Sequence, residues 1–379
     1  MIDPAAFLAR LEALGVRFVT GVPDSLLKQF CTQALGQLPP DRHIIAANEG
    51  ASIGLAIGHY LRSGRPALVY MQNSGFGNAI NPLISLADPE VYGIPMLLLV
   101  GWRGQPGVKD EPQHVKQGRV MTALLDAMEL PWALLPREQE AAEAVLSEAV
   151  ARTQGEERPF VLLVEKDSFA KATVEAAPSE GVSSLPSREE ALVALVEAIG
   201  KEAVRIATTG MLGRELFELR ARSGTSGARD FLTVGGMGHA SAIALGLALE
   251  EPGCEVWCLD GDGAALMHLG GLPIIAQNAP ASFFHVVFNN GVHDSVGGQP
   301  TAAARLSLAG LAEASGYRRS VTVQNLAHIA PQVATLREGG GPALLELRVR
   351  PGNRPDIGRP THTPRQARMA LMDALARGS

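Results

Sequence analysis

The feature that most constrains the fold is a regular alternation of short apolar runs with longer helical patterns. The first half contains ALVYMQ (67–72), MLLLVGW (96–102) and FVLLVE (160–165), and the second contains CEVWCLD (254–260) and FFHVVFNN (283–290). The runs VRFVTGV, HIIAANE, VRIATTG, FLTVGG and ALLELRV have the same character. Short β-rich runs separated by helices are typical of parallel strands joined by helical crossovers. The sequence therefore predicts an α/β protein with doubly wound parallel sheets.

The chain divides at a polar segment near its middle. Its 379 residues are enough for two domains with cores of their own. KATVEAAPSEGVSSLPSREEA (171–191) breaks the alternation, so we expect a domain over 1–170, a linker over 171–190 and a second domain over 191–379. Residues 51–104 and 240–293 share one order of elements. This favours a duplicated α/β unit, although any two doubly wound halves share that pattern.

Composition excludes several classes of function. The net charge is −6 and there is no long basic run, so we expect no nucleic-acid partner. The chain has no apolar stretch of about 20 residues, so we expect no membrane span, and MIDPAAFLARLEALG does not resemble a signal peptide. Cys31, Cys254 and Cys258 form no CxxC pair, which suits a cytoplasmic location. We interpret Cys254 and Cys258 as small core residues rather than metal ligands.

Two polar motifs end neighbouring apolar runs in the second half. Gly261, Asp262 and Gly263 follow CEVWCL, and Asn289-Asn290 ends the next run. A right-handed crossover brings the carboxyl ends of adjacent parallel strands to one edge, where Asp262 and an asparagine can share a cation. Oxygen ligands suit Mg²⁺, while the glycines and a helix beginning near Ala264 suit a phosphate. The combination predicts a Mg²⁺-diphosphate site, whereas GDG alone also fits an ordinary turn.

This arrangement resembles the motif of the thiamine diphosphate enzymes, in which GDG is followed by NN after a spacing like that of residues 264–288 here. The resemblance implies a pyrimidine-binding first domain and a diphosphate-binding second domain. It implies no central third domain, because only the linker separates the halves. It also implies that Asp262, Asn290 and the backbone carbonyl of Val292 bind Mg²⁺, and that Asn289 is structural.

The same family has an activating glutamate in its first domain, and Glu49 in HIIAANEGASIGLAIG (43–58) has the matching position. The helix dipole alone would also favour an acidic residue there. The resemblance implies that Glu49 hydrogen-bonds N1′ of the aminopyrimidine, which requires a carboxyl group shielded from water. It implies that Met237 supports the folded cofactor. Thr209 is a candidate phosphate ligand, and an N-cap role is equally open.

Residues GMGHAS (236–241) come close to a dinucleotide-binding signature. A nicotinamide-dependent dehydrogenase is therefore the alternative from another class. Its signature lacks the third glycine, and it leaves GDG and NN unexplained.

The segments FVTGVPDSLLK, GWRGQPGVKDEPQHVKQG (101–118) and NNGVHDSVGGQPT (289–301) resemble the two-domain decarboxylases of this family. These act on small 2-oxo acids with a second anionic group. The resemblance implies non-oxidative decarboxylation of 3-phosphonopyruvate to phosphonoacetaldehyde, in phosphonate biosynthesis, with sulfopyruvate as the alternative substrate. We expect residues 101–118 to form a loop that covers the substrate, although loop lysines are usually solvated.

The expected loop contains cations that suit a phosphonate group, namely Arg103, Lys109 and Lys116, and it also contains Gln113 and His114. The resemblance makes His114 and Asp24 in GVPDS the candidates for proton transfer. His293 and Asp294, which come after the metal-binding residues, either face the substrate or brace that loop.

The family also implies an assembly. In its members Glu49 and the diphosphate site of one active site come from different subunits, so we expect a homodimer or a larger homo-oligomer with active sites at the interface.

Overall fold

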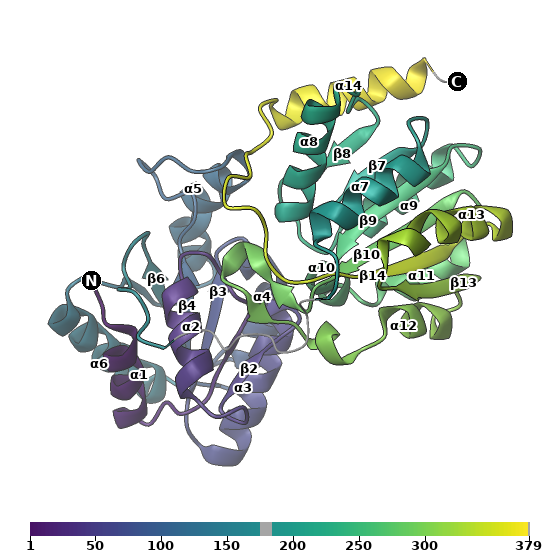
Figure 1. Cartoon of the computed structure of the whole chain (residues 1–379). Coiled ribbons are helices and arrows are strands. Elements are labelled where there is room, and N and C mark those ends of the chain that lie inside the picture. Colours follow the sequence, from purple (N-terminus) through teal and green to yellow (C-terminus); the bar gives the residue numbers. More distant parts are fainter. Residues whose placement is uncertain (175–183, 378–379) are drawn as a thin grey trace. The chain divides into compact units, whose positions relative to one another are not determined.

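The computed structural model describes residues 1–174 and 184–377 (Figure 1). They form two compact units, Met1–Pro178 and Ser179–Ser379, which are described separately. Residues 175–183 of the expected linker lie outside the described residues. Before them, the backbone N–H groups of Ala172 and Thr173 donate to side chains of the first unit. After them, helix α7 (Arg188–Ile199) begins the second unit with a capping box formed by Ser187 and Glu190.

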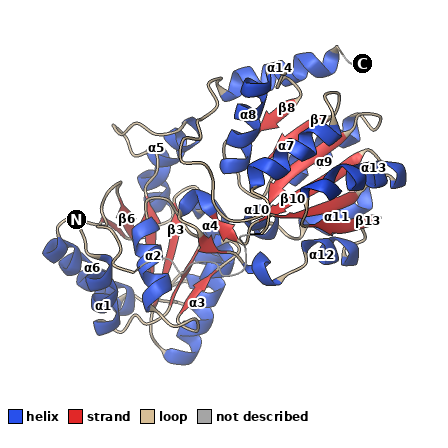
Figure 2. Ribbon diagram, in the orientation of Figure 1, coloured by secondary structure: helices blue, strands red, loops and turns tan. Residues whose placement is uncertain are grey.

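The first unit is a parallel sheet with helices on both faces (Figure 2). Its strands are β1 (Val19–Gly21), β2 (His43–Ile45), β3 (Ala67–Gln72), β4 (Met96–Gly101), β5 (Trp132–Leu134) and β6 (Pro159–Val164). Its helices are α1 (Pro4–Ala13), α2 (Lys28–Gln37), α3 (Glu49–Ser63), α4 (Phe76–Pro82), α5 (Pro112–Ala127) and α6 (Gln139–Gly155), with a π-helical turn η1 (Leu83–Ala87). The strand order is β2-β1-β3-β4-β6-β5.

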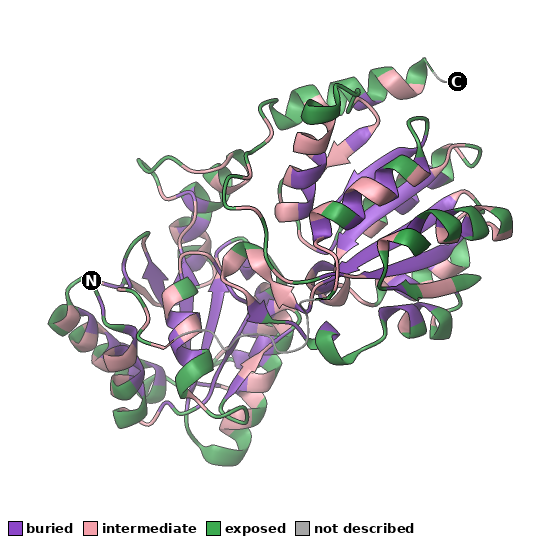
Figure 3. Ribbon diagram, in the orientation of Figure 1, coloured by how far each residue is buried: buried purple, intermediate pink, exposed green. Residues whose placement is uncertain are grey.

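The central strands of this sheet are buried on both faces, as Figure 3 shows for β3 and β4. In β4, Leu97 and Leu99 pack into the core beneath α1, α2 and α6. Met96, Leu98 and Val100 enter the opposite core beneath α3, α4 and α5. Alternate side chains of a strand point to opposite faces, so a strand covered by helices on both sides is apolar throughout. This explains why the predicted strands have continuous apolar runs.

The second unit is built in the same way. Its main strands are β7 (Val204–Ala207), β8 (Asp230–Leu232), β9 (Val256–Gly261), β10 (Phe283–Asn289), β13 (Arg319–Val323) and β14 (Ala343–Arg348). Its further helices are α8 (Met211–Ser223), α9 (Ala240–Glu250), α10 (Asp262–Met267), α11 (Gly271–Asn278), α12 (Leu308–Ala314), α13 (Ile329–Gly339) and α14 (Pro364–Ala376). Strands β11 (Val292–His293) and β12 (Gln299–Pro300) form an antiparallel pair, and 3₁₀ turns occur at η2 (Asp294–Val296), η3 (Ala302–Arg305) and η4 (Leu326–His328).

The two main sheets share one topology. Read from β8, the strand order of the second sheet is β8-β7-β9-β10-β14-β13. If the six main strands of each unit are numbered along the chain, both sheets have the order 2-1-3-4-6-5. The direction of winding changes between β1 and β3 in one unit and between β7 and β9 in the other. Ligands of open α/β sheets bind beyond the carboxyl ends of the strands at such a point. The predicted doubly wound fold and its repetition are therefore confirmed.

Several local expectations are wrong. The single helix expected to begin near Ala264 and to reach the next strand is instead the two helices α10 and α11, because Gly270 and Gly271 interrupt it. Residues 101–118, expected as a loop, are helical from Pro112, which occupies the first helical position. Strands β5 and β13 were missed, because their partly exposed residues form no buried apolar run.

None of the helices among the described residues is long and apolar enough to cross a membrane.

Candidate active site

Glu49 is a buried carboxylate at the start of α3 in the first unit. Asn48 caps this helix by accepting a hydrogen bond from the Ala51 backbone N–H at 2.8 Å, so the chain turns sharply and directs Glu49 inward. Glu49 is 5% exposed, and Asn78 Nδ2 donates to its Oε2 at 2.8 Å. Burial raises the pKa of Glu49, and the hydrogen bond from Asn78 lowers it by a smaller amount. The carboxyl group is thus able to exchange a proton nearer to neutral pH than an exposed glutamate.

The loop after β3 is shaped around this carboxylate. A Cβ atom at Gly75 would overlap the Glu49 carboxyl group. Only glycine therefore permits the backbone of this loop to pass so close to Glu49. Neither Gly75 nor Asn78 was predicted as a site residue, although the glycine-rich loop NSGFGN after an apolar strand was a usable signal.

Asp24 is a second buried carboxylate of the first unit, just after β1. It is fully buried, Gln72 Nε2 donates to its Oδ1 at 2.5 Å, and the Leu26 backbone N–H donates to its Oδ2 at 3.0 Å. Burial raises the pKa of Asp24, and the hydrogen bond from Gln72 opposes that effect. Since Gln72 ends β3, Asp24 lies at the point where the sheet changes its direction of winding.

Arg103 lies just after β4 and is held by neighbouring polar groups. Its Nε and Nη2 donate to Asp110 at 2.8 and 2.5 Å, and its Nη1 donates to Ser25 Oγ at 2.9 Å. The ion pair raises the pKa of Arg103. Burial acts to raise the pKa of Asp110, but its hydrogen bonds with Arg103 and Gly104 outweigh burial and lower that pKa. Its charge also acts on Asp24. The guanidinium group is therefore committed to ordering residues 103–110, and a substrate would have to share it with Asp110.

The remaining residues of the 101–118 segment differ in exposure. Lys109 and Lys116 are exposed. Gln113 and His114 lie on the first turn of α5, and Gln113 Oε1 and His114 Nδ1 are buried atoms without a hydrogen-bond partner among the described residues. Burial lowers the pKa of His114 to about 4, so the ring is neutral at pH 7. These two atoms are available to a ligand.

Asp262 begins α10 at the end of β9 in the second unit. It is 3% exposed, and burial raises its pKa to about 6. The Thr301 hydroxyl donates to Asp262 Oδ2, and the Thr301 backbone N–H donates to the Gly291 carbonyl at 2.8 Å. Thr301 thus connects Asp262 to the segment that contains Asn290 and Val292. Strands β9 and β10 are adjacent and parallel, with Gly261 paired to Phe288, as the two motifs predicted.

The side chain of Asn290 is oriented by an ion-pair network. Asn290 Nδ2 donates to Asp294 Oδ2 at 2.7 Å, and Arg188 Nη1 donates to the same oxygen at 2.8 Å. Arg188 also forms a two-point pair with buried Glu215 at 2.8 and 2.9 Å. Because its amide nitrogen is fixed, Asn290 presents Oδ1, which accepts from the Val292 backbone N–H at 3.1 Å. Of the two roles considered for Asp294, the contacts show bracing of the loop.

Asn289 has a different role from its neighbour. It is 1% exposed, its Nδ2 donates to Glu346 Oε1 at 2.7 Å, and its Oδ1 accepts from the Gly291 backbone N–H at 3.2 Å. Both ends of the amide are used inside the fold, so Asn289 supports the loop rather than a ligand.

The other cofactor candidates surround the same strand ends. Thr208, after β7, is buried, and its hydroxyl has no hydrogen-bond partner among the described residues. Thr209 is half-buried, and Gly210 rather than Thr209 is the N-cap residue of α8. Met237 is half-buried between Gly236 and Gly238, both of which have positive φ. The two threonines are suited to contact a phosphate, and Met237 is suited to contact an apolar ring face.

The glycines of GDG serve different purposes. A Cβ atom at Gly261 would meet nothing within 4 Å, so this glycine leaves open space beside the chain. A Cβ atom at Gly263 would lie 2.8 Å from the His293 ring, so Gly263 admits that ring. Burial lowers the pKa of His293 to about 4, which makes it a neutral, closely packed group.

The second unit fits a Mg²⁺-bound diphosphate by its own chemistry. Asp262 and Asn290 offer one anionic and one neutral oxygen, the hard ligands that Mg²⁺ prefers. Among the described residues, no cation lowers the raised pKa of Asp262, and the Thr208 hydroxyl has no hydrogen-bond partner. A cation and a phosphate would supply them.

Comparisons with known proteins agree with this chemistry. Residues 208–347 match the model of the C-terminal TPP (thiamine pyrophosphate) binding domain of thiamine pyrophosphate enzymes, and residues 4–130 match the N-terminal TPP binding domain. Over 377 residues the chain is 35% identical to the phosphonopyruvate decarboxylase of Streptomyces viridochromogenes, covering 96% of this chain and 92% of that protein. The chain belongs to the thiamine pyrophosphate-dependent decarboxylase family. Its cofactor is therefore thiamine diphosphate, which is another name for thiamine pyrophosphate.

Two further relatives differ in how similar they are to this chain. The chain is 36% identical to the phosphonopyruvate decarboxylase of Streptomyces hygroscopicus, covering 97% of this chain and 92% of that protein. It is 24% identical to the sulfopyruvate decarboxylase of Methanosarcina acetivorans, covering 90% of each chain. GMGHAS lies inside the matched C-terminal domain, so the dehydrogenase alternative has no support.

Proposed function

We propose that this enzyme decarboxylates 3-phosphonopyruvate without oxidation, giving phosphonoacetaldehyde and CO₂. The similarity of nearly the whole chain to two phosphonopyruvate decarboxylases supports this substrate over sulfopyruvate. We also propose a cytoplasmic location, which the free thiols of the three cysteines support.

In the second unit, Asp262, Asn290 and the Val292 carbonyl would hold Mg²⁺, and Thr209 with the open backbone at Gly261 would contact the diphosphate. Met237 would support the ring system of the cofactor. When bound, thiamine diphosphate would supply a nucleophilic carbon for the keto group and a positively charged ring that can accept the electron pair left by CO₂. Arg188 and Asp294 hold the amide nitrogen of Asn290, so Oδ1 is the atom that the side chain would offer to the cation.

In the first unit, Glu49 would hold a proton at N1′ of the aminopyrimidine. Its burial and its neutral partner Asn78 support that role, because a carboxyl group with a raised pKa can share a proton near neutral pH. Asp24, whose pKa is also raised, would donate the proton that replaces CO₂. The neutral ring of His114 would hydrogen-bond the keto oxygen, and Gln113 would assist it.

The phosphonate group would bind near residues 103–116. Lys109 is an exposed cation there, and Arg103 is an ordered one. His293, packed against Gly263, would contact the substrate from the second unit. An anionic group of this size needs charge-assisted hydrogen bonds, which a guanidinium and an ammonium group provide.

The substrate can be tested with purified protein, thiamine diphosphate and Mg²⁺. We expect phosphonoacetaldehyde by ³¹P NMR, with CO₂ release in equal amounts. The kcat/KM for phosphonopyruvate should exceed those for sulfopyruvate and pyruvate. A higher kcat/KM for sulfopyruvate would reverse the substrate assignment, and no thiamine-dependent CO₂ release from any of the three would contradict the proposed reaction.

We further propose a homo-oligomer that pairs Glu49 of one subunit with Asp262 of another. Helix α9 is apolar around its circumference, yet Ile243 and Leu249 are 40% and 49% exposed in the single chain. On α3, Leu61 is 72% exposed, and Gly54 and Gly58 have open space above them. Apolar helix faces of this kind suit contact with another copy.

Mixing two inactive variants tests this arrangement. We expect Glu49→Gln and Asp262→Asn, refolded together, to recover about a quarter of the wild-type activity, because half of random dimers are mixed and each has one intact site of two. If each active site lay within one chain, the mixture would stay inactive.

A further inference from the structure

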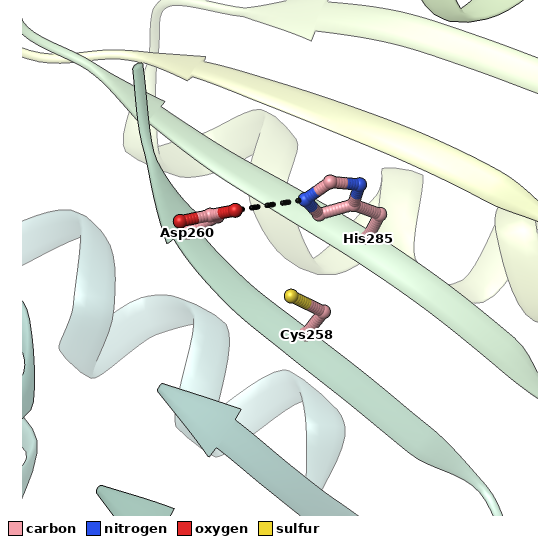
Figure 4. Close-up of side chains that lie close together, drawn as sticks. All are labelled: Cys258, Asp260 and His285. Atoms are coloured by element: carbon pink, nitrogen blue, oxygen red, sulfur yellow. Dashed lines mark ion pairs between the residues drawn. The ribbon is translucent and has the colours of Figure 1, made fainter. Parts of the chain in front are cut away.

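Three ligand-type side chains meet inside the second unit, before the GDG motif. Cys258 and Asp260 lie on β9 and His285 lies on the adjacent strand β10, where it pairs with Cys258. Figure 4 shows that the thiol, the carboxylate and the imidazole point toward one another. Their ligand atoms lie within 4.8 Å of one another. All three residues are at most 1% exposed.

Two atoms of this cluster have no hydrogen-bond partner among the described residues. Asp260 Oδ2 and His285 Nε2 are 3.5 Å apart and form an ion pair only when the imidazole is protonated (Figure 4), and neither makes a hydrogen bond within the part of the chain that the structure describes. A buried polar atom without a hydrogen-bond partner destabilises a fold, because it loses its hydration without compensation. Two such atoms facing each other beside a thiol therefore suggest a missing group between them.

The opposite atoms of the same side chains are engaged. Asp260 Oδ1 accepts from the Gly261 backbone N–H at 3.0 Å, and His285 Nδ1 lies 3.3 Å from the Tyr317 hydroxyl. Metal-binding histidines and carboxylates are usually oriented in this way by hydrogen bonds from outside the coordination sphere. The fold thus directs Oδ2 and Nε2 toward a common point.

The geometry and charge suit a tetrahedral transition metal ion. Zinc bonds of about 2.0–2.1 Å to nitrogen and oxygen place those atoms about 3.3 Å apart, close to the observed 3.5 Å. A thiolate and a carboxylate neutralise a 2+ charge, so the occupied site adds no net charge to the core. Mg²⁺ is a poor alternative, because it prefers oxygen ligands to sulfur and imidazole.

We propose that Cys258, Asp260 and His285 bind a zinc ion through three protein ligands, with a water molecule as the fourth. This zinc site is separate from the cofactor site and does not depend on the proposed substrate. It joins β9 to β10 immediately before Gly261, so it fixes the two strands whose ends carry Asp262 and Asn290. Binding releases the thiol proton of Cys258 to solvent, because zinc coordinates the thiolate.

The test is the metal content of the full chain produced in zinc-supplemented medium and dialysed against EDTA, which also removes Mg²⁺. We expect about one zinc per chain by mass spectrometry in wild type. Cys258→Ser should retain less than about a tenth of it, and Tyr317→Phe should lose zinc about 10–100-fold faster. Cys254→Ser is the matched control, because Cys254 lies just before the same strand and outside the cluster; it should retain the full amount.

A second measurement covers the case in which Cys258→Ser does not fold. Wild-type protein produced with Co²⁺ should show a thiolate-to-cobalt charge-transfer band, with d–d bands of tetrahedral intensity. The proposal is overturned if wild type holds no stoichiometric transition metal, if Cys258→Ser retains the zinc, or if bound cobalt shows no thiolate band.

Discussion

The two units have the same sheet and opposite chemistry at its carboxyl end. In the first unit, the strand ends carry Asp24 and Glu49, whose carboxylates accept hydrogen bonds from the neutral amides of Gln72 and Asn78. In the second unit, Asp262 shares its strand ends with the oriented amide oxygen of Asn290. One unit thus presents buried carboxyl groups with raised pKa values, and the other presents oxygens of the kind that suit a cation.

The difference shows how loops, rather than topology, assign function. Both units place polar residues where the winding changes, because carboxyl ends of parallel strands meet there. Burial raises the pKa of Glu49 and of Asp262 alike. The neighbouring side chains then determine the chemistry, since an amide donor leaves the carboxyl group to titrate, while an array of oxygen acceptors favours a cation.

The largest expected effect comes from removing the titrating group of the first unit. Glu49→Gln should lower kcat by about 10²–10⁴-fold, the usual contribution of general acid–base catalysis, without loss of stability. Steady-state kinetics measure kcat, and thermal unfolding measures the stability. Glu12→Gln, at an exposed position on α1, is the control and should match wild type. A Glu49→Gln enzyme with more than a tenth of wild-type kcat would rule out the assigned role.

The fit around Glu49 is the next target. In Gly75→Ala the new Cβ would overlap the Glu49 carboxyl group, and a shift of about 1 Å at a catalytic group can cost about 10²-fold in kcat. Gly77→Ala, in the first turn of α4, meets nothing within 4 Å and should keep its activity. Equal kcat values for the two variants would show that this close approach is unimportant.

The asparagine pair tests the cation side of the comparison. Asn290→Ala should weaken Mg²⁺ binding about 10–100-fold, measured by titration calorimetry in the presence of thiamine diphosphate. Asn289→Ala should leave Mg²⁺ affinity near that of wild type and lower the free energy of unfolding by about 1–3 kcal/mol, because Glu346 loses a buried donor. The opposite pattern would exchange the roles of the two residues.

The last prediction concerns acid stability of the first unit and leaves activity at neutral pH unchanged. Burial lowers the pKa of His43 to about 4, while an unfolded histidine titrates near 6.5. Between these values the unfolded chain binds more protons, so stability is present above pH 6.5 and is lost as pH falls toward 4. The loss is at most about 1.4 kcal/mol per pH unit.

Urea unfolding across this pH range isolates that contribution. His43→Gln should make the free energy of unfolding depend less on pH, because the unfolded chain then binds up to one proton fewer relative to the folded chain. His328→Gln, at an exposed position, is the control. An unchanged slope in His43→Gln would assign the acid sensitivity to other groups.

The sequence by itself determined the fold class, the repetition of the α/β unit and the meeting of GDG with NN. These features depend on local patterns, since strands buried on both faces must be apolar and adjacent parallel strands end at one edge. Edge strands β5 and β13 escaped prediction, because half-exposed strands carry no such pattern. The helix from Pro112 could have been found from proline at its first position.

Only the tertiary structure decided which groups touch. Gly75 against Glu49, Gln72 on Asp24, and Arg188 with Asp294 behind Asn290 join segments far apart in the chain, so no local pattern encodes them. Cys258 shows the same limit, because a cysteine in an apolar strand indicates a core position until Asp260 and His285 are placed beside it. Sequence periodicity records which face of an element is buried, whereas the identity of its buried neighbours depends on how the elements pack.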